Sequence, residues 1–191
     1  MSHLNETKQL TEKMINRILL RIKIVQLLYA YTKNQSKSID SAKKELLLSI
    51  EKTYSLYHSL LLLIIEITSF AEKKLEAGKN KLRPTAEDLN PNTRFVDNLF
   101  VKQLSKNNDL LAYVKEQHLS WDAYPTAIKS IYESIVSSDF YEAYMNAPTT
   151  TYEEDRELWR KIVKKCILVN EELDIAFEEQ CIYWNDDVDI V

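Results

Sequence analysis

The chain has 191 residues, 25 Lys and Arg against 29 Asp and Glu, a formal net charge of −4 and a single glycine. This length supports one large domain or two small ones, and the negative charge argues against a generic nucleic-acid binder. So few glycines argue against tight strand turns and phosphate-cradling loops, because both need residues that accept positive φ. Helix-forming residues dominate instead, so the predicted fold class is all-α, as a multi-helix bundle.

The first helix is predicted over residues 14–32, after a polar and aperiodic N-terminal extension at residues 1–13. Met14 could also be the natural start of the chain. At about 100° per residue, one stripe of this helix holds Arg17, Arg21, Ile24 and Leu28. The helix is apolar around most of its circumference, so we expect neighbouring helices to bury most of it.

A long second helix is predicted to end near Ala77, and either Asp40 or Ser41 can cap its start. Apolar and tyrosine side chains recur within it at spacings of three or four residues. Gly78 then supplies a left-handed C-terminal cap. The segment 79–94 is rich in polar residues and contains two prolines, which predicts an ordered loop.

Shorter helices are expected at about residues 94–105, 109–117, 123–137, 139–145, 152–169 and 171–184. Thr151 begins a capping motif for the fifth of these helices. The best internal boundary is Pro148, which separates a helical N-terminal region at residues 14–147 from a helical segment at residues 148–191. The final apolar and acidic pattern, residues 188–191, is expected to lead into a C-terminal core that this chain lacks, which would leave the bundle incomplete.

The sequence shows no catalytic or metal-binding motif. The three histidines belong to no HExxH or ExxH pattern, and the single glycine rules out the glycine-rich nucleotide loops. Cys166 and Cys181 lack CxxC spacing, so buried thiols are expected rather than zinc ligands. Asp186 and Asp187 could hold a metal, but a solvated chain end is the commoner meaning. We therefore expect no enzyme, no cofactor and no metal site.

The sequence also shows no recognisable signal peptide or membrane-spanning segment. The N-terminus has no apolar signal region followed by small residues. The longest uninterrupted apolar run, residues 60–65, falls far short of the roughly 20 residues that span a bilayer. The expectation is a cytoplasmic protein that makes no membrane contact.

Charge is unevenly distributed along the chain. Basic residues outnumber acidic ones from Lys8 to Lys44, whereas residues 171–191 contain eight acidic residues and no Lys or Arg. An anionic ligand is therefore expected near the N-terminus.

The first helix carries the candidate binding residues. Two arginines one turn apart, Arg17 and Arg21, are by themselves an ordinary solvated face. Here they lie with Lys23 on an otherwise apolar helix, and Tyr29 lies two turns beyond Arg21. Cations suit phosphates and an aromatic ring suits an unstacked base, so Arg17, Arg21, Lys23 and Tyr29 are predicted to bind RNA.

The segment Gln26-Leu27-Leu28-Tyr29, preceded by Arg17 and Arg21, resembles the arginine-bearing first helix of the NusB transcription antitermination family, which ends in Gln-x-Leu-Tyr. Residues 79–98 and 183–187 resemble the long-form branch of that family. The resemblance covers nearly the whole chain from Met14. The Asn-Glu pair and the Phe-x-Asn-Gly-x-Leu-Asp ending of the family are absent.

The resemblance implies a NusB-like all-α fold that binds single-stranded boxA RNA. It also implies partnership with NusE, the ribosomal small-subunit protein that doubles as an elongation factor, in the RNA polymerase antitermination complex. Arg17, Arg21 and Tyr29 are the RNA-facing positions carried over, whereas Lys23 rests on its charge alone. The missing C-terminal block would normally supply the NusE surface and part of the RNA groove. The alternative is a helical protein-interaction module in which the basic residues of the first helix meet an acidic partner.

Overall fold

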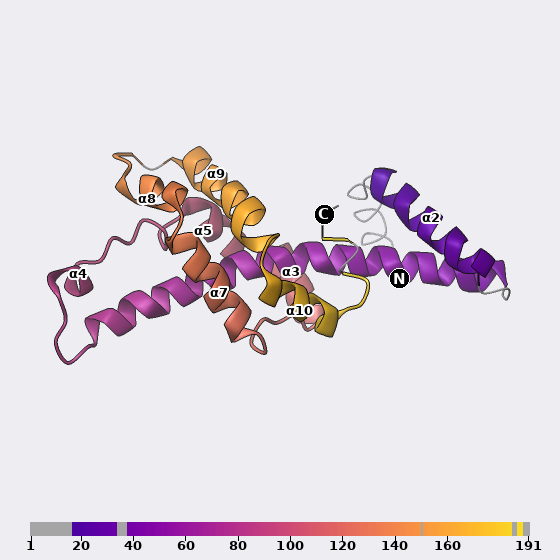
Figure 1. Ribbon diagram of the computed structural model, residues 1–191, viewed down its shortest axis with the longest axis horizontal. Coiled ribbons are helices and arrows are strands. Elements are labelled where there is room, and N and C mark those ends of the chain that lie inside the picture. The colour runs from indigo at the N-terminus through magenta and orange to yellow at the C-terminus, as the bar shows by residue number, and fades with distance from the viewer. Residues whose placement is uncertain (1–16, 34–37, 150, 185–186, 189–191) are drawn as a thin grey trace. The chain divides into compact units, whose positions relative to one another are not determined.

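Regular secondary structure is entirely helical in the part of the chain that the computed structural model describes, which comprises residues 17–33, 38–149, 151–184 and 187–188 (Figure 1). The predicted all-α class is confirmed. The chain divides into two compact units, a terminal unit of residues 1–57 and 181–191 and a central unit of residues 58–180. The predicted boundary at Pro148 falls within the central unit.

The terminal unit contains α2, Arg17–Lys33, and the beginning of α3, Ile39–Lys79. The N-terminal extension predicted at residues 1–13 and the first turn of the predicted helix lie outside the described residues. Neither Asp40 nor Ser41 caps α3, so that prediction is wrong. Ser38 accepts a hydrogen bond from the Ser41 amide at 3.3 Å, which makes Ser38 the N-cap.

The C-terminal segment returns to α3 in the terminal unit. Trp184 is buried, and its indole nitrogen donates a hydrogen bond to the Lys52 carbonyl at 3.0 Å. Leu19 of α2 and Ile50 of α3 are buried as well. This unit therefore joins residues from both ends of the sequence, which no local pattern indicates.

Gly78 lies inside α3 and does not end it, so the predicted left-handed cap is wrong. A Cβ at this position would lie only 2.9 Å from the Asp88 carboxylate. A side chain here would force the Asp88 carboxylate to shift, so this position favours glycine through close approach and not through backbone freedom. Asp88 completes a capping box with Thr85 at the start of α4, Ala86–Leu89, within the segment predicted as a loop.

The central unit contains the C-terminal part of α3, with α4, α5 (Leu99–Ser105), α6 (Asn108–Glu116), α7 (Pro125–Val136), α8 (Asp139–Asn146), α9 (Tyr152–Ile162), the π-helical η1 (Val163–Ile167) and α10 (Glu171–Gln180). Most predicted helices occur within a few residues of their expected positions, and Thr151 forms the expected capping box at α9. Two boundaries differ. α5 begins five residues later than predicted because Asn98 caps it through the Val101 amide, and α10 ends at Gln180.

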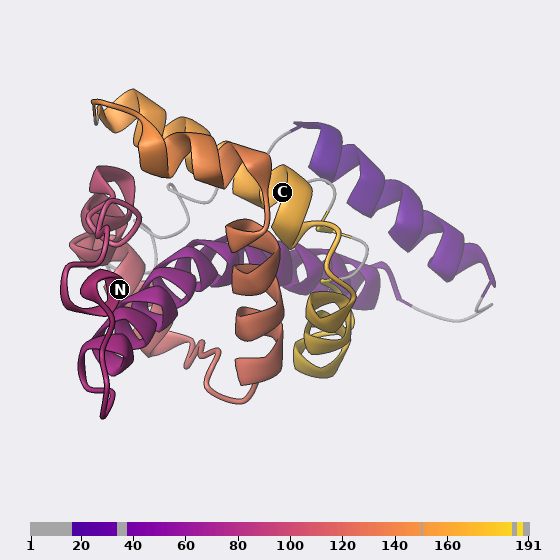
Figure 2. The ribbon, with the colours of Figure 1, turned by 60° about the vertical axis from the view of Figure 1, so that its left-hand side comes forward.

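Helix α9 packs on α5 and α8, while α7 contacts η1, α8 and α10; Figure 2 shows α7 (orange) and α10 (yellow) side by side. Aromatic side chains fill the core of this unit. The rings of Phe95 and Trp159 lie 5.6 Å apart, and those of Trp121 and Phe177 lie 6.0 Å apart. The Trp121 indole donates to the Ser59 carbonyl at 2.9 Å, which ties the cluster to α3.

The π-turn η1 decides which side chains face this core. Ile162, Cys166 and Ile167 are all buried. In a regular α-helix Ile167 would point away from Ile162, whereas the wider π-turn places both Cys166 and Ile167 on the buried side. The expectation of a buried thiol is confirmed for Cys166, while Cys181 is half-buried.

Helix α3 is long and apolar enough to cross a membrane by length and composition, although its longest uninterrupted apolar run is short. Of its most apolar 18-residue window, 56% is buried inside the protein. The core helix of a soluble protein can meet the same criterion. One such helix is therefore weak evidence for a membrane span.

Candidate functional site

Three of the four candidate residues on helix α2 belong to a series of exposed side chains spaced four residues apart. Arg17, Arg21, Val25, Tyr29 and Lys33 follow one another at this spacing and are all exposed. Residues four apart are neighbours on a helix surface. They form a row that winds around the helix, here called the exposed row, which contains three of the four predicted residues and adds Lys33.

Tyr29 is the aromatic member of the exposed row, with 65% of its surface exposed. The Lys33 ammonium lies 5.7 Å from the centroid of its ring, a cation–π contact. Such a contact stabilises the ring by about 0.5–1 kcal/mol at an exposed site. It holds the ring beside a cation while leaving most of its surface open to a ligand.

Lys23 is not part of the exposed row. Its side chain is only 4% exposed, and its Nζ lies 2.5 Å from Oδ1 of Asp187, which is fully buried. Thr53 of α3 donates a hydrogen bond to the other carboxylate oxygen, Oδ2, at 2.5 Å. The charge of Lys23 is therefore matched inside the protein, and this arrangement withholds it from an RNA phosphate.

The interpretation of Asp187 as part of a solvated chain end is also wrong, because its side chain has no exposed surface. Asp186, its proposed metal-binding neighbour, lies outside the described residues. Asp187 instead joins the C-terminal segment to α2 through Lys23 and to α3 through Thr53.

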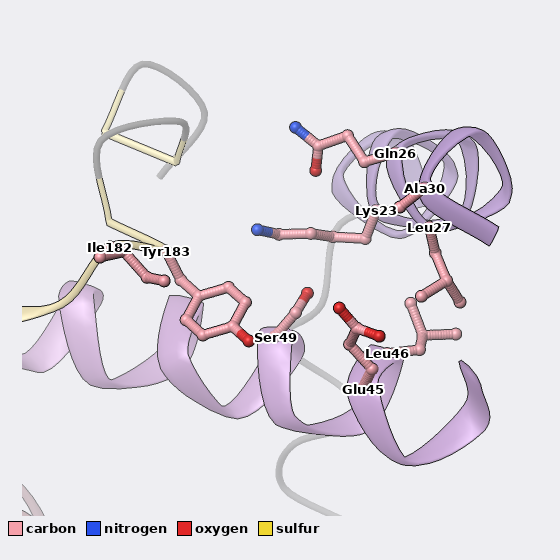
Figure 3. Close-up of a pocket in the computed structure, with 9 residues that line it drawn as sticks. All are labelled: Lys23, Gln26, Leu27, Ala30, Glu45, Leu46, Ser49, Ile182 and Tyr183. Carbon is pink, nitrogen blue, oxygen red and sulfur yellow. The ribbon is translucent and has the colours of Figure 1, made fainter. Parts of the chain in front are cut away.

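A pocket of about 290 Å³ separates α2 from the first turns of α3 in the terminal unit. Figure 3 shows Lys23 and Gln26 reaching over it from α2, with Glu45 and Ser49 on α3 and the Tyr183 ring at its edge. The pocket is slightly smaller than the range of about 300–1,000 Å³ typical of ligand sites. Because its lysine is already paired with Asp187, it offers no unmatched cation to an anionic ligand.

The expectation that neighbouring helices bury most of α2 is wrong. Ile18 is 59% exposed, Val25 65% and Leu28 55%. Only the side of α2 that carries Leu19 and Lys23 is fully buried. The exposed row therefore lies among apolar side chains, so the exposed surface of α2 combines cations, an aromatic ring and apolar groups.

A second polar constellation lies buried in the central unit. The Asp155 carboxylate, with no exposed surface, accepts hydrogen bonds from the Tyr144 hydroxyl and from the Leu99 amide, each at 2.6 Å. Asn98 donates to the Tyr144 hydroxyl and to the Asp155 carbonyl, both at 3.3 Å. The Arg94 guanidinium lies over the Tyr144 ring, 4.5 Å from its centroid.

Burial, followed by the hydrogen bond to Asp155, raises the pKa of Tyr144 to about 12. The phenol therefore stays protonated and keeps donating to the carboxylate throughout the neutral range. Both oxygens of Asp155 are engaged and the group has no contact with solvent. The cluster is suited to holding α5, α8 and α9 together rather than to acid–base chemistry.

No group of three or more His, Cys, Asp and Glu side chains that could hold a metal ion occurs among the described residues. Sequence reasoning missed two features of the terminal unit. Lys33 could have been found from the four-residue spacing of Arg21, Val25 and Tyr29. The role of Asp187 could not, because its partner Thr53 is 134 positions away.

Comparison of the chain with protein-family models, with curated proteins and with solved structures finds no match. The resemblance to NusB proteins therefore rests on the residue pattern of α2 and on segments 79–98 and 183–187. Geometry adds the exposure of three of its predicted residues, Arg17, Arg21 and Tyr29.

Proposed function

We propose that this chain is a non-catalytic, cytoplasmic transcription antitermination factor of the NusB type. It binds single-stranded, boxA-like RNA together with NusE and acts as a scaffold in the RNA polymerase antitermination complex. The observation that carries the proposal is that Arg17, Arg21 and Tyr29 of the exposed row are all exposed to solvent on α2. The family resemblance supplies the identity of the RNA and of the protein partner.

The chemistry of the exposed row suits a single strand better than a duplex. Guanidinium groups pair with phosphate oxygens through charge-assisted hydrogen bonds. A ring beyond them can stack on a base only if that base is not already stacked in a helix. Arg17 and Arg21 would thus hold the backbone while Tyr29 holds a base, with Lys33 adding a further cation beside the ring.

The double variant Arg17→Gln and Arg21→Gln should bind RNA more weakly, and its binding should be less sensitive to salt. Each phosphate contact on a single strand contributes about 0.7 to the slope of log affinity against log salt concentration. Two lost contacts should lower the slope by about 1.4. The measurement is binding of a boxA-like RNA across a salt series, with and without NusE.

The matched control is the double variant Lys43→Gln and Lys44→Gln, which removes two exposed cations from α3 in the same unit. It should keep a slope close to that of the parent. Equal slopes for the arginine variant, the lysine variant and the parent would show that Arg17 and Arg21 are only a solvated face.

Tyr29→Ala should behave differently from the arginine variant. Stacking of a base on an aromatic ring is worth about 1–3 kcal/mol, so affinity should fall by about 5- to 150-fold. The salt slope should stay nearly unchanged, since a ring releases no counterions. Tyr29→Phe should retain binding, and Tyr31→Ala, an exposed tyrosine outside the exposed row, should have little effect. A larger loss for Tyr31→Ala than for Tyr29→Ala would contradict the assignment.

The exposed apolar side chains beside the row favour a second candidate, a helical protein-interaction module. Ile18 and Leu28 are both more than half exposed, and such surface is typical of the core of a protein interface. Changing both to glutamine should then abolish binding of a protein partner, and on this second function the parent chain should bind no RNA. If the parent bound NusE but no RNA, this second function would replace the first.

A further inference from the structure

The outer side of α9 and η1 carries a dense group of positive charges. We call it the cationic strip; its members are Arg156, Arg160, Lys161, Lys164 and Lys165. All five are exposed; Glu157 lies among them, and the exposed acids Glu153 and Glu154 lie in the first turn of α9, before the strip begins. Acidic residues outnumber basic ones in the central unit as a whole, so positive charge is gathered on this side of the helix.

Helical geometry arranges these cations in rows. Arg156, Arg160 and Lys164 are four residues apart, which separates neighbours by about 6 Å along the helix axis. Lys161 and Lys165 form a second row beside the first. The opposite side of the helix is anchored in the core through the buried Trp159 and Ile162, and α9 packs on α5 and α8. The strip is therefore carried by a fixed scaffold.

Little of this charge is neutralised within the protein. Arg160 lies 3.6 Å from Glu157, but both side chains are more than half exposed, so the pair contributes little. Lys165 lies over the Phe140 ring, 5.6 Å from its centroid. Among the described residues, Arg156, Lys161 and Lys164 take part in no ion pair. The strip presents a field that attracts anions.

We propose that the cationic strip is a second RNA-binding surface, which contacts phosphates outside the boxA-like element and does not read sequence. The proposal rests on the function proposed for α2 and extends it to a longer RNA. Positive charge that follows a helix in rows is the electrostatic footprint of phosphate-backbone binding.

RNA fits the strip better than an acidic protein does. A protein interface needs apolar or aromatic surface at its centre, whereas the apolar residues within 156–165 are buried or half-buried. The contrast with α2, which exposes Ile18 and Leu28, is clear. Beside Lys165 lies a pocket of about 600 Å³ whose lining includes Ser134, Ser137 and Ser138, hydroxyls that can hydrogen-bond phosphate or ribose, and Asp139, which can accept only from a ribose hydroxyl.

The test uses polyuridine, which carries no boxA sequence, and the full chain with Arg17 and Arg21 already changed to glutamine. The strip variant adds Arg156→Gln, Arg160→Gln and Lys164→Gln. A matched control instead adds Lys73→Gln, Lys106→Gln and Lys115→Gln, three exposed cations of the central unit outside the strip. Circular dichroism should show that both variants remain folded. The strip variant should lower the salt slope for polyuridine by about 2.1, and the control should not.

Equal slopes for the strip variant and the control would overturn the proposal. So would failure of the starting chain, in which only Arg17 and Arg21 are changed, to bind polyuridine. A third outcome also overturns it, namely that the strip variant loses binding to polyglutamate but keeps binding to polyuridine, which would assign the strip to an acidic protein. The two proposals can fail separately. The role of Arg17 and Arg21 is tested with boxA-like RNA in a chain whose cationic strip is unchanged, whereas the strip is tested with polyuridine.

Discussion

Asp187→Ala should destabilise the attachment of α2 to the terminal unit by about 3–5 kcal/mol, the usual effect of removing one partner from a buried ion pair. The change leaves the Lys23 ammonium, only 4% exposed, without its carboxylate. It also removes the acceptor of the Thr53 hydroxyl. Hydrogen exchange measured by mass spectrometry should show faster exchange in the α2 amides, because the free energy of local opening falls.

Two variants test whether the buried charge is the cause. Thr53→Val removes one hydrogen bond to Asp187 and should cost less, about 1.5–3 kcal/mol. Lys23→Met combined with Asp187→Leu replaces the ion pair with apolar side chains and should recover most of the protection, since well-packed apolar residues often match a buried pair. If α2 exchanges at the parent rate in Asp187→Ala, the ion pair does not hold this helix.

The same variant connects stability with binding. When α2 detaches, the exposed row of Arg17, Arg21 and Tyr29 loses its fixed support, and a ligand must then also offset the cost of ordering the helix. RNA affinity should therefore fall in Asp187→Ala although Asp187 itself is buried and cannot touch the RNA. The Lys23→Met and Asp187→Leu combination should restore this affinity if Lys23 has no direct role.

Asp155→Ala should lower the free energy of unfolding of the central unit by about 4 kcal/mol. The carboxylate accepts from the Tyr144 hydroxyl and the Leu99 amide, both at 2.6 Å. The buried Tyr144 hydroxyl and the part-buried Leu99 amide both lose their acceptor, and a buried donor left without a partner costs about 1–3 kcal/mol. Chemical denaturation followed by circular dichroism and by the fluorescence of the buried Trp159 measures the loss.

Controls for this prediction come from the same helix and the same cluster. Glu153→Ala removes an exposed acid two positions away and should change stability by no more than about 0.5 kcal/mol. Asp155→Asn keeps one acceptor oxygen and should lose less than alanine. The combination with Tyr144→Phe should be less than additive, with a coupling of about 0.5–3 kcal/mol. Equal stabilities for Asp155→Ala and Glu153→Ala would show that the cluster does not hold the helices together.

Local signals explain which predictions succeeded. The all-α class followed from composition, since helix formers dominate and only one glycine is present. Thr151 was found as a helix start because a capping box is encoded within four residues. Gly78 was misinterpreted because its requirement comes from the Asp88 side chain, ten positions away, and not from its own backbone.

The candidate site divides in the same way. A four-residue spacing is a local property, so the sequence could place Arg17 and Arg21 on one stripe. Whether that stripe is exposed depends on what covers α2, and the apolar circumference of this helix wrongly suggested that most of it is buried. Lys23 was grouped with the arginines by charge alone, although the partner of its charge lies at the far end of the chain.

The sequence by itself determined the helical class, most helix positions and the order of cations along α2 and α9, because propensity, capping and periodicity act over a few residues. Only the tertiary structure decided which cations remain available to a ligand. Lys23 is neutralised by Asp187, whereas Arg21 stays exposed two positions before it. The physical reason is that burial and ion pairing depend on residues brought together from opposite ends of the chain, and no spacing within a helix specifies such partners.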